Sequence, residues 1–455
     1  MSYFSGSLYT KSSRKKNYQK KIDYKQKKLM SIVIIGAGYV GLPLAIALSK
    51  FHNVICFDIN KKRISELKKG NDTNHQHSKK EILKKSLKFS YRKSELKNKN
   101  TYIVTVPTPI NNSNKPNLKM LHQASLMIGK LIQKNSIIIY ESTTYPGCTE
   151  EYCIPLIEKS SGLKFEKNFF VAYSPERVNP GDKINTLKNI TKIVAANDTK
   201  TLIRAKKIYQ KISKSIHTVD KIKVGESAKV IENIQRDINI AFVNELSVLF
   251  KKLDISTNEV LKAASTKWNF HYYKPGLVGG HCISVDPYYL AHKAKLNNYY
   301  PELILSGRRF NENMGNYVSN QTLKLLSENN LNYSEVNLAI LGFSFKENIP
   351  DIRNTKIIQI INGLRKKKIK VKLFDSIVSK SKVKKLYNLK VYDFKELKKF
   401  KFDAIILAVS HKSFLKKLSY YSQFYKDKEN KIFVDLKNNY SIYNLSNEKF
   451  KFFQL

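Results

Sequence analysis

The sequence has 455 residues and a formal net charge of +46. A chain of this length exceeds the size at which one hydrophobic core keeps growing, so we expect two or three domains. Its four cysteines lack metal-ligand spacing and are too few for a disulfide scaffold, and no apolar run approaches the roughly 20 residues of a membrane helix. We therefore expect a soluble protein in a reducing cytoplasm, without a metal centre or a membrane anchor.

The positive charge raises the possibility of nucleic-acid binding. Lysine is spread along the whole chain, however, together with abundant Asn, Ile and Tyr, which AT-rich codons favour. No helix-turn-helix, zinc-finger or RNA-binding signature accompanies it. Compositional drift explains the charge better than a nucleic-acid partner, although a positive field would also suit an anionic substrate.

Residues 1–29 are polar and Lys-rich and predict a disordered basic tail. Residues 30–218 alternate helical stretches with short apolar runs, which are IVIIGAG, VICFDIN, TYIVTVP, SIIIYES and FFVAYSP. This alternation predicts a parallel sheet with helices on both faces.

A glycine motif follows the first of these runs. Gly36, Gly38 and Gly41 form G-x-G-x-x-G between a strand and a helix, and Asp58 ends the next strand about 20 residues on. Glycines at these positions admit a pyrophosphate to a helix N-terminus, and the acid binds a ribose hydroxyl. An acid at this position favours NAD over NADP.

The stretch AYSPERVNPGD, residues 172–182, ends another predicted strand. Its Glu176 would lie at the carboxyl end of a parallel strand, where α/β proteins bind ligands. A plain ion pair within the loop is an equally good interpretation of this stretch alone.

A helical middle domain is expected over residues 219–325. KVGESAKVIENIQRDINIAFVNELSVLFKKLDI has apolar positions at helical spacing and predicts one helix of about 30 residues. Lys229 and Asn233 are four residues apart on one face of it and could converge on one ligand atom, with Arg236 three residues further on. A solvated polar face is the alternative.

The loop KWNFHYYKPGLVGGHCISVDPYY places Cys282 behind two glycines and four residues before Asp286. Free cysteines are usually buried apolar residues, so this one could be a simple core residue. Glycines that let the backbone close around a ligand, and a carboxylate within reach, favour a nucleophile instead. A nearby lysine or helix terminus would lower the pKa of the thiol and favour the thiolate.

A second α/β unit is expected over residues 334–445, with strands in VNLAILGFSF, KVKLFD, AIILAVS and KIFVDLK. Both IVIIGAG and LAILGFS end a strand on glycine, so the two halves could be related. The expected fold class is α/β: two Rossmann-like, doubly wound parallel-sheet domains joined by a long central helix and a helical middle domain.

Ten motifs between Met30 and about Leu445 also resemble one family: GAGYVGLPLA, FDINKKRISELKKG, TVPTPI, ESTTYPG, YSPERVNPGD, AKVIENIQRDINIAFVNEL, TKWNF, KPGLVGGHCISVDPYYLAHKA, RRFNENMG and GFSFKENIPDIRNTK. Together they resemble the UDP-glucose/GDP-mannose dehydrogenase family, and within it the branch that oxidises UDP-N-acetylhexosamines. The chain departs from that branch at HYYKPG, at Ser284 and at NDTNHQHSKK. These departures bear on substrate specificity and rate rather than on the reaction.

The resemblance implies roles for individual residues. Cys282 would be the nucleophile, Lys229 and Asn233 would stabilise the reacting oxygen, and Glu176 and Asp286 would be acid/base groups. Thr143 would lie near the catalytic water and the nicotinamide. The cofactor-binding residues would be Gly36, Gly38, Tyr39, Val40, Gly41, Asp58, Arg63, Thr108, Thr143 and Arg353. The substrate-binding residues would be Glu176, Arg177, Lys229, Asn233, Arg236, Lys267, Tyr273, Gly279 and Lys346.

The implied reaction converts the C6 alcohol of the sugar to a carboxylate and uses two NAD molecules in turn. A thiolate would trap the intermediate aldehyde as a thiohemiacetal, whose oxidation gives a thioester that water hydrolyses. The resemblance also implies a homodimer formed through the long helix, a third domain that binds uridine diphosphate, and a role in surface polysaccharide biosynthesis. UDP-glucose or UDP-N-acetylmannosamine is the alternative substrate. A catalytically silent nucleic-acid-binding or scaffold protein is the alternative from another class.

Overall fold

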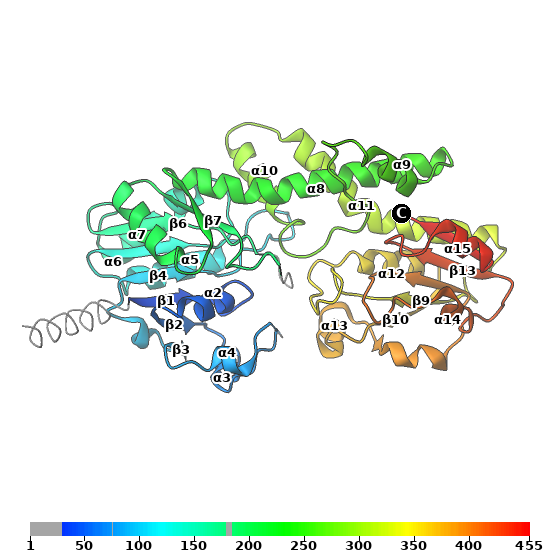
Figure 1. Ribbon diagram of the computed structural model, residues 1–455, viewed down its shortest axis with the longest axis horizontal. Helices are drawn as coiled ribbons and strands as arrows, with labels where there is room; N and C mark the ends of the chain where they lie inside the picture. The colour runs from blue at the N-terminus through cyan, green and yellow to red at the C-terminus, as the bar shows by residue number, and fades with distance from the viewer. Residues whose placement is uncertain (1–29, 75, 179–183) are drawn as a thin grey trace, which may run out of the picture. The chain divides into compact units, whose positions relative to one another are not determined.

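The structure, a computed structural model, describes residues 30–74, 76–178 and 184–455 (Figure 1). The expected disordered tail and the last part of the PERVNPGD motif lie outside these residues. The chain forms two compact units. The first contains the described residues up to 108, 118–142 and 147–225, and the second contains 109–117, 143–146 and 226–455.

An eight-stranded sheet forms the centre of the first unit, in the order β3-β2-β1-β4-β5-β6-β7-β8. The strands are β1 Ser31–Ile35, β2 Asn53–Phe57, β3 Leu87–Ser90, β4 Thr101–Val104, β5 Ser136–Tyr140, β6 Phe169–Tyr173, β7 Thr191–Ala196 and β8 Ser215–Val219. The five predicted strands are confirmed, and β3, β7 and β8 are additional. All pairs are parallel except β6 with β7, which is antiparallel.

The helices of this unit are α2 Gly41–Leu48, α3 Lys61–Lys68, α4 Lys79–Ile82, α5 Lys119–Gly129, α6 Ile154–Ser161 and α7 Thr199–Tyr209. The 3₁₀ turn η1 Lys93–Leu96 and the π turn η2 Thr149–Cys153 complete the set among the described residues. Every residue of β4 and β5 is buried. Their near-continuous apolar sequences are typical of strands covered on both faces.

The turn between β1 and α2 is closed by backbone contacts. Gly36 N–H donates to the carbonyl of Phe57 over 2.8 Å. A Cβ atom at Gly41 would lie 1.9 Å from the carbonyl oxygen of Gly36, so no other residue fits without displacing the backbone. A Cβ atom at Gly38 would meet nothing within 4 Å, which leaves space beside this turn for a ligand.

The second unit contains most of α8, Ile222–Lys252, which is the predicted long helix (Figure 1). It has 31 residues. The other helices of the middle region are α9 Thr257–Ala264, α10 Asp286–Leu296 and α11 Glu302–Glu328. Within residues 30–74, 76–178 and 184–455, no helix combines the length and apolar character needed to cross a membrane.

A six-stranded parallel sheet forms the rest of this unit, in the order β11-β10-β9-β12-β13-β14. The strands are β9 Asn337–Leu341, β10 Lys370–Phe374, β11 Val391–Tyr392, β12 Ala404–Leu407, β13 Lys431–Asp435 and β14 Phe450–Gln454. The helices are α12 Ile357–Lys366, α13 Lys380–Tyr387, η3 Phe394–Lys399, α14 Leu418–Ser422 and α15 Ile442–Asn447. Four of these strands were predicted. Because β14 pairs with β13, the sheet extends beyond residue 445, where the sequence placed the end of the domain.

The turn after β9 repeats the geometry of the turn after β1. Gly342 N–H donates to the carbonyl of Phe374 over 2.8 Å, and Phe343 N–H donates to the Asp375 carboxylate over 2.8 Å. In the first unit, Ala37 N–H donates to Asp58 over the same distance. The two sheets therefore begin with the same strand-glycine-acid arrangement, as the two glycine-ended strands suggested.

Candidate active site

The Cys282 loop packs directly against the segment that follows β9. Gly280 has φ +84°, and a Cβ atom there would lie 2.8 Å from the ring of Phe345. Gly280 N–H donates to the carbonyl of Arg353 over 3.1 Å, and the Asn354 amide donates to the carbonyl of Gly280 over 2.8 Å. Ser284, which stands where the resembled branch has glycine, donates its hydroxyl to the same carbonyl over 2.6 Å. The two glycines therefore allow the close approach that holds this loop.

Asp286 is the first residue of α10 and lies beside Asn233 of α8. The Asn233 amide donates to Asp286 Oδ2 over 2.6 Å, although the two residues are 53 positions apart. Asp286, Lys229 and Asn233 are all buried. One face of the long helix therefore lies against the start of α10, four residues after Cys282.

The protonation state of the thiol differs from the expectation. Burial raises the pKa of Cys282 to about 11, and the charge of Asp286 adds to this rise. Lys229, Arg353 and Arg236 lower the pKa of the thiol by smaller amounts. The expected thiolate is thus wrong for this conformation, because the cost of burying a negative sulfur outweighs the neighbouring cations.

Asp286 supplies a proton acceptor at the same place. Burial raises the pKa of its carboxyl to about 6, against the opposing effects of Lys229 and the Asn233 hydrogen bond. At neutral pH this carboxyl is mostly ionised while the thiol carries a proton. The pair can therefore pass a proton from sulfur to oxygen when an electrophile arrives.

The other three cysteines have no comparable surroundings. Cys56, Cys148 and Cys153 are buried, whereas Cys282 is partly exposed. Burial raises the pKa of Cys56 to about 12. Among the four, Cys282 is the one that combines access with a neighbouring acid and base.

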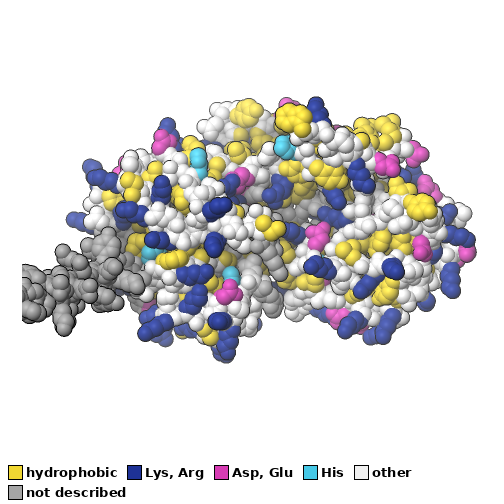
Figure 2. Space-filling view, in the orientation of Figure 1, with side chains coloured by type: hydrophobic (Ala, Val, Ile, Leu, Met, Phe, Trp, Pro, Cys, Tyr) yellow, Lys and Arg dark blue, Asp and Glu magenta, His cyan; other side chains and the backbone are white. Residues whose placement is uncertain are grey.

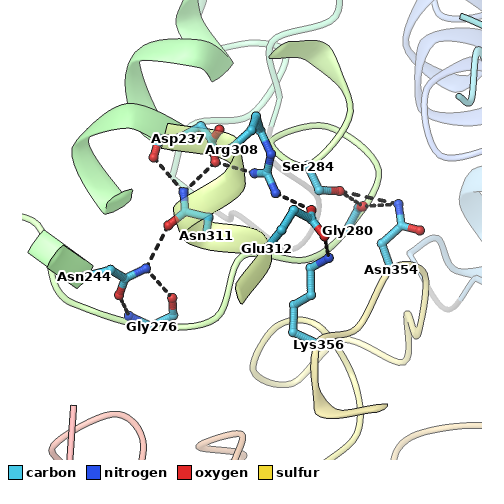
Figure 3. A network of polar contacts seen from close by, with 10 residues as sticks. All are labelled: Asp237, Asn244, Gly276, Gly280, Ser284, Arg308, Asn311, Glu312, Asn354 and Lys356. Carbon is cyan, nitrogen blue, oxygen red and sulfur yellow. Dashed lines mark hydrogen bonds and ion pairs between the residues drawn. The ribbon is translucent and has the colours of Figure 1, made fainter. Parts of the chain in front are cut away.

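A buried polar network supports the start of the Cys282 loop (Figure 3). Arg308 of α11 is 1% exposed and donates to Asp237 of α8 and to Glu312, over 2.5 Å in each case. Asn311 donates to both the carbonyl and the carboxylate of Asp237 over 2.8 Å. Burial raises the pKa of Asp237, and Arg308 opposes that rise.

The same network continues into the loop and to α12. Asn244 donates its amide to Asn311 over 2.8 Å and to the carbonyl of Gly276 over 3.0 Å, and it accepts from Gly276 N–H over 2.8 Å. Lys356, which precedes α12, donates to Glu312. Burial raises the pKa of Glu312, but Lys356 and Arg308 outweigh this effect and hold it below its usual value. Two long helices, the loop and the C-terminal sheet domain are thus tied together.

The dinucleotide turn of the first unit has the features that a pyrophosphate needs. No side chain caps the N-terminus of α2 at Val40, and its first turn contains no acid. The Asp58 carboxylate accepts from the backbone N–H groups of Ala37 and Asn60, both over 2.8 Å. With the open space at Gly38, these residues fit NAD.

Arg63, a predicted cofactor-binding residue, contacts the protein side of this turn. Its guanidinium donates to the carbonyl of Ala37 over 3.1 Å, to Thr73 over 3.0 Å and to Asp72 over 2.8 Å. The side chain is buried. In this structure it holds the turn in place.

The remaining predicted site residues are distributed over both units. Glu176 follows β6 and accepts from the backbone N–H groups of Arg177 over 2.7 Å and Val178 over 2.5 Å. Arg177 donates to the carbonyl of Thr191 over 2.7 Å. Of the others, Arg236 and Lys267 are exposed, whereas Tyr39, Thr108, Thr143, Tyr273, Gly279 and Lys346 are of intermediate exposure.

Arg353 lies on the segment that holds the Cys282 loop. Its guanidinium donates to the Asp351 carboxylate over 2.5 to 3.0 Å. Burial lowers the pKa of the neighbouring His281 to about 4, and the charge of Arg353 contributes to this effect. The neutral His281 and the network around Arg308 were not identified from the sequence. The Arg-x-x-Asn-Glu spacing in RRFNENMG, with side chains on one helical face, was the available signal.

We expect Arg308→Leu to destabilise the protein by about 3–5 kcal/mol, because it leaves Asp237 buried and without its cation. Arg309→Leu is the matched control, since Arg309 is exposed and donates only to Ser306 in the described structure. Denaturant unfolding of both variants measures the difference. Equal stability of the two variants would contradict the role of this network.

We expect alkylation of Cys282 by iodoacetamide to be slow at pH 8 and to accelerate up to and beyond pH 9, because the thiol pKa is about 11. Asp286→Asn removes a negative neighbour, which lowers the thiol pKa and should speed alkylation at pH 8 several-fold. Peptide mass spectrometry locates the label, and Cys282→Ser controls for the other cysteines. A rate that is unchanged or slower in Asp286→Asn would count against this electrostatic coupling.

Comparisons with known proteins match one family over three parts of the chain. Residues 30–213 match the NAD binding domain of the UDP-glucose/GDP-mannose dehydrogenase family, residues 223–313 its central domain, and residues 339–442 its UDP binding domain. The chain is 49% identical to UDP-N-acetyl-D-glucosamine 6-dehydrogenase of Salmonella typhi, over 85% of this chain and 91% of that protein. It is 45% identical to the enzyme of the same name from Pseudomonas aeruginosa, with the same coverage.

A solved structure shows the same fold. The UDP-D-ManNAc dehydrogenase of Pyrococcus horikoshii superposes with a TM-score of 0.84 and 29% identity, over 93% of this chain and 99% of that one. Lysine and arginine side chains are scattered over the face in Figure 2 rather than gathered in a stripe, in line with their spread along the sequence. The chain belongs to the UDP-glucose/GDP-mannose dehydrogenase family and is an NAD-dependent oxidoreductase.

Proposed function

We propose that the protein oxidises the C6 hydroxymethyl group of UDP-N-acetylglucosamine to the carboxylate. The observation that carries this proposal is the cluster around Cys282, in which the charges of Asp286 and Lys229 act on the thiol and Asn233 bonds Asp286. A dehydrogenase that stopped at the aldehyde would have no need of a thiol with a proton acceptor and a lysine beside it. The names of the similar enzymes supply the sugar.

The turn after β1 would hold NAD, which would supply the hydride acceptor for both oxidations at C6. Between them, Cys282 adds to the aldehyde carbon and passes its proton to Asp286, which gives a thiohemiacetal. Lys229 and Asn233 donate to the oxygen of this species and stabilise its developing charge. Loss of the second hydride from C6 of this oxyanion leaves a thioester on Cys282, and Asp286 keeps the proton taken from the thiol.

Hydrolysis of the thioester needs a second base. Asp286 lies beside the thiol, so we assign the water to Glu176, with Thr143 as a further contact for that water. Attack of the water releases the uronic acid and regenerates the thiol. The two carboxylates thus have separate tasks, one in trapping and one in release.

For the cofactor, we assign the pyrophosphate to the turn formed by Gly36, Gly38 and Gly41, with Tyr39 and Val40 at the start of α2. Asp58 binds a ribose hydroxyl, while Arg63 supports the turn by donating to the carbonyl of Ala37. Thr108, Thr143 and Arg353 remain predicted cofactor contacts. The uridine diphosphate belongs to the domain that follows β9, with Lys346 as a predicted contact.

The acetamido group of the sugar is a finer part of the proposal. The motifs PERVNPG, ENIQRD and KWNF, which resemble those of the N-acetylhexosamine branch, support an acetamido-binding pocket. Arg236, Lys267 and Tyr273 are its predicted contacts. A pocket with polar groups for an acetamido substituent leaves them unpaired when the substituent is missing. UDP-glucose and UDP-N-acetylmannosamine are the alternative substrates. The cytoplasmic location and the role in surface polysaccharide biosynthesis stay predictions.

We also propose that α8 forms a homodimer interface. Ile231, Phe242 and Leu249 of α8 and Leu253, directly after it, are 47–56% exposed. Their spacings of eleven, seven and four place them on one helical face. An apolar stripe of this length is typical of a helix that packs against a partner.

We expect a dimer in sedimentation velocity, and we expect Phe242→Glu with Leu249→Glu to give monomers, because two charges would be buried in the interface. Ile203→Glu is the matched control, since Ile203 is 47% exposed on α7. A monomeric wild type, or dimers that survive the double substitution, would contradict the assignment of α8.

We expect purified protein to form two NADH per molecule of UDP-N-acetylglucosamine, with a higher kcat/KM than for UDP-glucose or UDP-N-acetylmannosamine. Absorbance at 340 nm with a panel of UDP-sugars measures both quantities. Cys282→Ser should lose steady-state turnover by several orders of magnitude while folding and NAD binding survive. Only one NADH per sugar in the wild type, or normal turnover by Cys282→Ser, would overturn the proposal.

A further inference from the structure

A buried ion pair lies in the first unit, at a place that the proposed chemistry does not use. Lys192 and Glu141 have fully buried side chains, and the ammonium donates to Glu141 Oε2 over 2.9 Å. Tyr209, also fully buried, donates its hydroxyl to Glu141 Oε1 over 2.6 Å. Both carboxylate oxygens therefore have a donor.

The ammonium also binds the backbone of the two residues that precede Glu176. Lys192 donates to the carbonyl of Pro175 over 3.0 Å and to that of Ser174 over 3.4 Å. Pro175 directly precedes Glu176, while Glu141 follows β5 and stands two residues before Thr143. One ammonium thus fixes the carboxyl ends of β5 and β6 relative to each other, at the start of the two loops that carry predicted catalytic residues.

The reversed direction of β7 gives Lys192 this reach. Ala172 and Tyr173 of β6 pair antiparallel with Ala196 and Ala195, so β7 passes beside the end of β6. Burial raises the pKa of Glu141, and the charge of nearby Glu176 adds to this rise, so the two carboxylates feel each other. The Lys192 ammonium opposes that rise.

Stability alone is a weak reason for such a pair. Replacing a buried ion pair with well-packed apolar residues is often neutral or stabilising, because two charges must lose their water. A position that needs fixed geometry is a better reason, since misplacing a catalytic group by about 1 Å can cost about 100-fold in rate.

We infer that Lys192, held by Glu141 and Tyr209, is a positioning residue that sets the place of the Glu176 carboxylate for thioester hydrolysis. This inference rests on the function proposed above. It predicts that loss of the ammonium slows release of the product from Cys282 more than it affects binding of NAD or formation of the thioester.

The test compares Lys192→Met with the wild type on UDP-N-acetylglucosamine. We expect kcat to fall about 10- to 100-fold, while the Kd for NAD stays within about two-fold. Intact-mass spectrometry of acid-quenched enzyme should show the uronyl thioester on Cys282 accumulating during turnover. Lys192→Arg should recover most of the rate. A lower fraction of folded enzyme would reduce kcat but would not raise the thioester content.

Tyr209→Phe provides a second variant if Lys192→Met does not fold. It keeps the ring and removes the donor to Glu141, so we expect a kcat about three-fold lower with detectable thioester. Tyr140→Phe is its matched control, because Tyr140 is fully buried on β5 and bonds Ser125 rather than the ion pair.

The outcomes separate the two proposals. An active wild type, with Lys192→Met or Tyr209→Phe retaining normal kcat and no accumulated thioester, would overturn the positioning role alone. Equal thioester accumulation in Tyr140→Phe would also overturn it. A wild type that produces no NADH with any UDP-sugar would overturn the proposed function, and the positioning role with it.

Discussion

The guanidinium of Arg308 is the charge around which the Cys282 region is organised. A cation with 1% exposure must have acceptors, because a buried unpaired charge is too costly to tolerate. Asp237 and Glu312 supply them. Asn311 donates to Asp237 and accepts a hydrogen bond from the Asn244 amide through its side-chain oxygen. Asn244 in turn holds Gly276, six residues before Cys282. The position of the Cys282 loop therefore depends on an ion network made of residues outside the set of predicted catalytic residues.

The thiol and the carboxylate beside it form a coupled pair. The charge of Asp286 adds to the effect of burial and raises the pKa of the Cys282 thiol, so the sulfur keeps its proton before substrate binds. Once Asp286 accepts that proton, it no longer repels the sulfur. Proton transfer to Asp286 thus removes the negative charge that disfavours the thiolate, and the positive charge of Lys229 remains nearby. A resting thiol of this kind is also less exposed to oxidation than a permanent thiolate.

Much of this organisation follows from local sequence, because its signals are local. The glycine turn, Asp58, the nine predicted strands and the long helix each depend on short stretches with a definite period. The Asn233 to Asp286 bond joins residues 53 positions apart, and no local pattern encodes it. The same holds for Lys192, since TKIVAA reads as a strand in either direction. The expectation of a thiolate was wrong for a related reason. The sequence shows which cations are available, but burial decides whether the pKa of the thiol rises or falls.

The second glycine turn has a consequence for the order of events. Asp375 occupies the place that Asp58 has in the first turn, but it is fully buried and lies 3.2 Å from the imidazole of His411. Its carboxylate is already committed, so it offers no acceptor to a second nicotinamide nucleotide. On the proposed function, both oxidations must then share one cofactor turn, with a change of cofactor between them. During that exchange the bond between the sulfur of Cys282 and the sugar carbon keeps the sugar in place while one cofactor leaves the turn and the next one binds.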